Sequence, residues 1–128
     1  MKINFKSTIK QNNDERVVDF DADLEYTNED GYQVFTFSEP SEGIRNRIEV
    51  SDNEINIYAG STSVYLKYNQ VYNFDLDIDH HQWKNQIINL DSHWFLKDFQ
   101  ENSYSFTYTL SRNGTLLGEY AITLTIKE

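Results

Sequence analysis

The chain has 128 residues, of which 21 are acidic and 11 are basic, so its formal net charge is −10. This length fits one domain over 1–128, and the aromatic content of 15% favours β-structure, because aromatic side chains pack well on pleated, half-buried surfaces. The excess of acid argues against nucleic acid and against an anionic membrane surface as partners, since both attract clustered Lys and Arg.

The first two predicted strands span 2–10 and 16–26. Apolar and polar residues alternate in both, which gives each strand one buried face and one wet face. The wet faces carry a basic row, Lys2, Lys6 and Lys10, and an acidic row, Asp19, Asp21, Asp23 and Glu25. Antiparallel pairing sets the two rows side by side. The acidic row either binds a cation or is a solvated face that discourages edge pairing.

A third strand is predicted at 32–37, and three short strands follow between 44 and 68. Polar turns divide the three short strands, and two-residue loops at 52–53 and 61–62 keep their apolar residues on one side. The predicted cross-strand partners are Val50 with Ile55, Ile48 with Ile57, Ala59 with Val64 and Ile57 with Leu66.

The next part of the chain is less regular. A strand at 71–79 is followed by a predicted loop at 80–85 and a strand at 86–96. The segment 92–100 alternatively holds a turn of helix with Ser92 as its cap.

Two plainly alternating strands close the chain, at 104–110 and 120–126. Asn113-Gly114 between them indicates a hairpin. A simple two-residue loop there puts the two apolar rows on opposite faces, so we expect either a three-residue loop at 113–115 or a bulge near 116–118. The predicted partners are Tyr108 with Tyr120 and Phe106 with Ile122.

These segments predict an all-β fold: a single antiparallel β-barrel of eight to ten strands in meander order, with a two-sheet sandwich as the alternative. Each predicted neighbour is one turn away along the chain, which is typical of a meander. Closure into a barrel hides the edges of a long meander completely.

The order of four pieces resembles the YwiB-like family of small bacterial proteins. The pieces are INFKSTI, VVDFDADLEY, IRNRIEVSDNEINIYAG and the closing YSFTYTL with YAITLTI, which together span nearly the whole chain. The resemblance implies a calycin-type barrel, related in architecture to lipocalins. It implies no particular activity.

Four residues of the central strands are the candidate ligand-binding set: Arg45, Arg47, Tyr58 and Tyr65. The predicted registers place them on one face. If that face lines the interior, two guanidinium groups among tyrosines can hold an anionic head group such as a carboxylate. If it faces water, they are surface charges that balance nearby acids.

No catalytic or metal-binding motif is predicted. The absence of cysteine excludes thiolate ligands and cysteine nucleophiles, and no G-x-S-x-G or phosphate-binding glycine motif is present. The aspartates at 75, 77 and 79 begin like a calcium loop, but His80 and Gln86 stand where that loop needs glycine and a carboxylate. A zinc site from His80, His93 and Asp79 is weighed against exposed loop histidines.

The function expected is therefore a small β-barrel that binds a small apolar or amphipathic ligand, with no cofactor. The alternative is a protein–protein interaction or structural module that uses the aromatic segment from Trp83 to Phe99, and an enzyme is a third hypothesis. We expect a monomer or weak homodimer. The N-terminal sequence lacks the apolar core of a signal peptide, so a cytoplasmic location is expected.

Overall fold

The structure is a computed structural model that describes residues 1–78 and 86–128. Within them the chain forms eleven strands. No helix in this part of the chain is long and apolar enough to cross a membrane.

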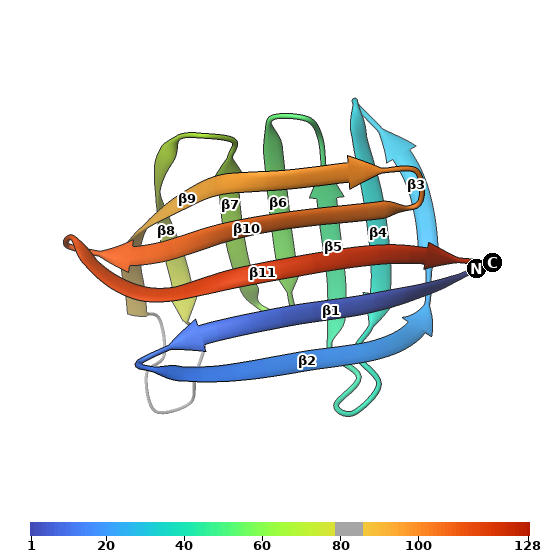
Figure 1. Cartoon of the computed structure of the whole chain (residues 1–128), viewed down its shortest axis with the longest axis horizontal. Helices are drawn as coiled ribbons and strands as arrows, with labels where there is room; N and C mark the ends of the chain where they lie inside the picture. Colours follow the sequence, from blue (N-terminus) through green and yellow to red (C-terminus); the bar gives the residue numbers. More distant parts are fainter. Residues whose placement is uncertain (79–85) are drawn as a thin grey trace.

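The strands form two antiparallel sheets (Figure 1). The six-stranded sheet has the order β2-β1-β11-β10-β9-β8 and the five-stranded sheet the order β3-β4-β5-β6-β7. The strands of the first are β1 (Lys2–Gln11), β2 (Asp14–Asp23), β8 (Val71–Ile78), β9 (Gln86–Gln100), β10 (Ser103–Arg112) and β11 (Thr115–Lys127). The strands of the second are β3 (Glu25–Glu29), β4 (Tyr32–Ser38), β5 (Arg45–Val50), β6 (Glu54–Ala59) and β7 (Thr62–Lys67).

The two sheets lie face to face with their strands crossing, as Figure 1 shows. The chain passes between them at two corners. At the first, β2 continues into β3 through the buried Leu24, whose backbone N–H donates to the Met1 carbonyl at 3.0 Å. At the second, between β7 and β8, Tyr68 forms a single parallel bridge with Trp94. Corners where strands change sheets are characteristic of crossed sheet packing.

The prediction of an antiparallel all-β meander is confirmed. Neighbouring strands follow one another along the chain, and the β1–β11 pairing joins the two ends of the meander. The strands exceed the predicted eight to ten because the run 16–26 divides at Leu24 into β2 and β3. The backbone ladders group into two sheets, as in the sandwich alternative, so closure into a single barrel stays a prediction.

The central hairpins confirm one predicted register and correct another. Val50 faces Ile55 and Ile48 faces Ile57 as predicted. In the next hairpin Ala59 faces Thr62 instead of Val64, because the loop is Gly60-Ser61 and not 61–62. Gly60 has a φ of +61°, which glycine adopts without strain. The slip is two residues, so the apolar row keeps its predicted face.

The closing hairpin contains the predicted bulge. Asn113-Gly114 forms a two-residue loop, and Tyr108 faces Tyr120 as predicted. The register shifts between Leu110, which faces Gly118, and Ser111, which faces Leu116. A Cβ at Gly118 would lie 3.0 Å from the Tyr120 hydroxyl oxygen, so glycine allows this close approach.

The alternative of a helical turn at 92–100 is wrong, because β9 runs unbroken to Gln100. A register shift between Thr107 and Tyr108 marks a bulge: Leu96 faces Thr107, whereas Trp94 faces Tyr108. The bulge keeps both the Trp94 ring and the Lys97 side chain on the side of the sheet that packs against the other layer, where each contacts Tyr68.

The hydrophobic core fills the space between the sheets. Its largest fully buried side chains are aromatic, and they come from both layers: Trp94, Phe35, Phe37 and Phe106. The Trp94 ring meets Tyr68 edge-on at 4.9 Å between centroids and packs near Phe99 and Phe106. Its indole N–H donates to the Leu96 carbonyl at 2.8 Å, which satisfies the buried donor.

Replacing Trp94 by Ala should lower the free energy of unfolding by about 3–5 kcal/mol, because the substitution leaves a cavity between the sheets. Urea unfolding followed by circular dichroism measures the loss. Leu96→Ala is the matched control: its side chain is 58% exposed, and the expected change is below about 0.5 kcal/mol. Equal losses in the two variants would contradict the assigned core.

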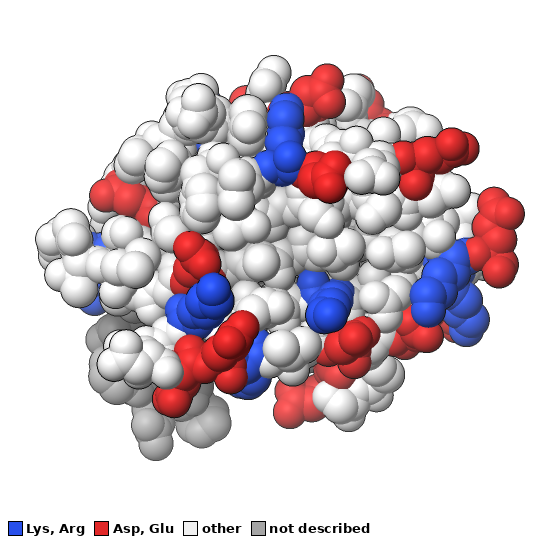
Figure 2. Space-filling view, in the orientation of Figure 1, with Lys and Arg blue, Asp and Glu red and all other residues white. Residues whose placement is uncertain are grey.

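The predicted charge rows meet on the outer face of the six-stranded sheet. Lys2 forms an ion pair with Asp23, and Lys127 contacts Asp21 at 3.2 Å. The Asn4 amide donates to Asp19 and Asp21, at 2.9 Å each. In Figure 2, which shows this face, basic groups lie beside acidic groups. The rows lie side by side as expected, with Lys2 opposite Asp23 and Lys6 opposite Asp19, although Lys10 forms its ion pair with Glu119 of β11. The strand β2 presents its acids along the sheet edge.

Asn4→Ala and Lys127→Met should each raise the pKa of Asp21. The pKa of Asp21 lies below its usual value mainly because of the hydrogen bond from Asn4, and secondarily because of the one from Lys127. Since the folded pKa is below the unfolded one, this carboxylate favours folding above a pH of about 4, and the contribution disappears as the pH falls. Carboxyl-detected NMR titration measures the pKa of Asp21 in each variant. Asp23, whose pKa is lowered chiefly by Lys2, is the internal control.

Candidate functional site

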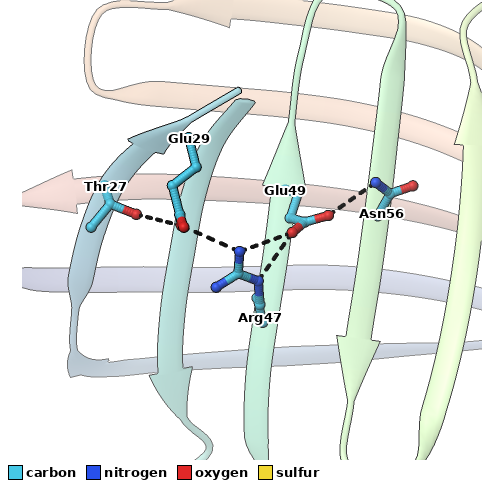
Figure 3. Close-up of polar contacts among 5 residues, drawn as sticks. All are labelled: Thr27, Glu29, Arg47, Glu49 and Asn56. Carbon is cyan, nitrogen blue, oxygen red and sulfur yellow. Dashed lines mark hydrogen bonds and ion pairs between the residues drawn. The ribbon is translucent and has the colours of Figure 1, made fainter. Parts of the chain in front are cut away.

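A polar network covers the outer face of the five-stranded sheet (Figure 3). Its centre is Arg47 on β5, whose guanidinium lies 3.0 Å from Glu49 and 3.2 Å from Glu29. Thr27 donates to Glu29 at 3.0 Å, and the Asn56 amide donates to Glu49 at 3.0 Å. The network therefore connects β3, β5 and β6. It raises the pKa of Arg47, chiefly through the hydrogen bond to Glu49.

The four predicted site residues share this outer face. Arg45 lies 3.4 Å from Glu25, Tyr58 stands opposite Arg47, and the Tyr58 and Tyr65 rings meet edge-on at 6.0 Å. Burial is the main reason that the pKa of Tyr58 is raised. The shared face agrees with the predicted registers. Both guanidinium groups already contact carboxylates of the chain, which is the surface arrangement weighed from sequence, and ligand binding by the four stays a prediction.

A double-mutant cycle with Arg47→Met and Glu49→Gln should give a coupling free energy of about 0.2–1 kcal/mol, because ion pairs this close to water gain little net stability. Urea unfolding of the single and double variants measures it. High salt should reduce the coupling. A coupling that is larger and independent of salt would show that this network is shielded from solvent.

The sequence predictions did not identify a cleft at one end of the molecule, which we call the end cleft. Its volume is about 450 Å³. Three turns contribute to it: the β3–β4, β5–β6 and β9–β10 turns. The lining residues are Gly31, Gln33, Val50, Ser51, Asp52, Phe99, Gln100, Glu101 and Tyr104.

Aromatic rings and a partly buried hydrogen bond lie at the inner wall of the end cleft. The Tyr104 ring packs edge-on against Phe35 at 5.4 Å and Phe99 at 5.5 Å. The Tyr26 hydroxyl donates to the Gln33 side-chain oxygen at 2.9 Å. The pKa of Tyr26 is raised, first by burial and then by the neighbouring Tyr104.

Lys97 links β9 to the β5–β6 turn beside the end cleft. Its ammonium donates to the Asp52 carbonyl at 2.6 Å. It also lies 4.2 Å from the centre of the Tyr68 ring and 5.7 Å from that of Phe99. A cation over aromatic faces is attracted by the ring quadrupoles, so this lysine holds the turn and the strand together at the cleft.

The remaining candidates that the structure describes do not line the end cleft. Among the described residues, no group of three or more His, Cys, Asp or Glu can hold a metal ion. His93 lies on β9 with its ring 5.8 Å from that of Phe95. Asp75 accepts a hydrogen bond from Asn89. Asp79, His80, His81 and Trp83 lie outside the described residues.

One relative places the chain in a family. An uncharacterised protein of Mycoplasmopsis pulmonis is 30% identical over 137 aligned residues, and the alignment covers 100% of both chains. The two proteins belong to one family. The match extends over the full length of both proteins, but the relative's name assigns no activity. No family model matches the chain.

A solved structure has the same fold. The crystal structure of the ywiB protein from Bacillus subtilis matches with a TM-score of 0.68, covering 99% of this chain and 91% of that one. Sequence identity is 13%, so the likeness concerns the fold alone. It agrees with the resemblance carried by the four sequence pieces.

Proposed function

We propose that this protein is a small-molecule-binding module and that the end cleft holds its ligand. The volume of about 450 Å³ falls in the range of known ligand pockets, roughly 300–1,000 Å³. The observation that supports the proposal is the combination of aromatic walls, Phe99 and Tyr104, with hydrogen-bonding groups at the rim. An amphipathic ligand with an apolar body and a polar end fits this lining.

We extend the proposal to the family and architecture. The four sequence pieces and the likeness to the Bacillus subtilis protein support membership of the YwiB-like family with a calycin-type, lipocalin-like barrel. Barrels of that kind hold one small ligand near the open end. The end cleft resembles such an open end, because it lies at one end of the molecule and turns of both sheets line it. A cytoplasmic location belongs to the same proposal.

The alternative is an interaction surface in the segment from Trp83 to Phe99. Within its described part, Trp94 is fully buried, and Phe99 packs against Trp94 and Tyr104. These rings belong to the core and the end cleft. Leu96 and Ile87 are exposed and remain available to a partner. Sedimentation of the purified protein tests whether it is a monomer or a weak homodimer.

The neutral dye N-phenyl-1-naphthylamine should bind with one molecule per chain and gain fluorescence, because its size suits the end cleft and its rings can pack against Phe99 and Tyr104. Gln100→Trp should abolish binding by filling the end cleft. Gln70→Trp, on the β7–β8 turn, is the matched control and should leave binding unchanged. Binding that survives Gln100→Trp would place the site elsewhere, and an absence of binding to the unmodified protein would count against a ligand pocket.

Native mass spectrometry of freshly purified protein complements the dye experiment. It reports a co-purified ligand and the oligomeric state together. We expect an added mass of small-molecule size that is lost in Gln100→Trp and kept in Gln70→Trp.

A further inference from the structure

The charged side chains that line the end cleft are all acidic. From this charge distribution we propose that the end cleft selects an organic cation, a primary ammonium or guanidinium group on a small aromatic or alkyl body. The inference rests on the proposed function, because it names the ligand class for the same cleft.

Two carboxylates stand at the rim. Asp52 comes from the β5–β6 turn and Glu101 from the β9–β10 turn, so they approach the cleft from different sheets. Both residues are exposed, and neither forms an ion pair within residues 1–78 and 86–128. No Lys or Arg lines the cleft. A ligand cation is thus the partner that these carboxylates lack.

The neutral polar groups offer both donors and acceptors: the Gln33 side-chain oxygen already accepts from Tyr26, which leaves its amide N–H groups as donors. The Gln100 amide N–H donates to Asp98 at 3.2 Å, which leaves its carbonyl oxygen for a ligand. The Ser51 hydroxyl both donates to the Glu54 carbonyl and accepts from the Glu54 N–H, so it has little left to offer. Tyr104 adds a hydroxyl oxygen. An ammonium group carries three donors and no acceptor, so it can pair with the two carboxylates and with the Gln100 oxygen.

The chain's own Lys97 shows that this corner of the molecule accommodates an ammonium. Its partners include the Asp52 carbonyl and the Phe99 ring, and both residues also line the end cleft. A ligand cation in the cleft can meet the same two kinds of group, an oxygen acceptor and an aromatic ring. An anion would instead approach two carboxylates in a chain of net charge −10.

Three probes of similar shape and different charge test the inference: phenethylamine as the cation, phenethyl alcohol as the neutral form and hydrocinnamate as the anion. NMR titration of the labelled full chain reports both affinity and location, through the amide signals of Gly31, Asp52 and Glu101. Phenethylamine should bind about tenfold more tightly than the alcohol, since each charge-assisted hydrogen bond is stronger than its neutral counterpart. Hydrocinnamate should bind most weakly.

Asp52→Asn with Glu101→Gln should remove this preference, so that phenethylamine binds about as tightly as the alcohol. Asp14→Asn with Glu15→Gln is the matched control: it removes the same charge from the start of β2, which contributes nothing to the end cleft, and should keep the preference. If the alcohol or the anion binds in the cleft as tightly as the amine, the inference is wrong and the binding module stands. If no probe shifts the cleft signals, the proposed function fails as well.

Discussion

Burial of the apolar rows of two crossing sheets against each other is the constraint on which the structure depends. Because side chains alternate, most strands bury one face and expose the other. In β4 both faces are covered, since the adjacent Val34 and Phe35 are both buried. The aromatic side chains Trp94, Phe35, Phe37 and Phe106 fill the space between the layers. The polar faces that remain carry the ion-pair networks, including the one around Arg47. Strand alternation therefore places the side chains that stabilise the fold in the core and the ion-pair networks on the surface.

Much of the fold could be predicted from the sequence because this alternation is a local signal. The strands, their buried faces and the pairing of Tyr108 with Tyr120 all follow from a period of two and from turn residues. The β6–β7 register was missed by two residues, because a two-residue slip leaves every side chain on the same face. The division at Leu24 was missed because a bend within an alternating run leaves no compositional mark.

The candidate site was less predictable. Side-chain alternation was enough to predict that Arg45, Arg47, Tyr58 and Tyr65 share one face, since the two-residue slip leaves faces unchanged. The end cleft depends instead on how closely three turns, distant in sequence, approach one another once the sheets cross. No local pattern encodes that distance. The available signal was the pair of aromatics, Phe99 and Tyr104, that face each other across the β9–β10 turn.

The pairing of β1 with β11 has a consequence for how the chain folds during synthesis. Residues from Lys2–Lys127 to Lys10–Glu119 are partners, so this ladder joins segments more than a hundred positions apart. The hairpins of the five-stranded sheet can form as soon as they leave the ribosome. The β1–β2 hairpin must wait with one long edge open until β11 emerges, and the acidic row of β2 keeps the opposite edge from pairing with a neighbouring chain in the meantime.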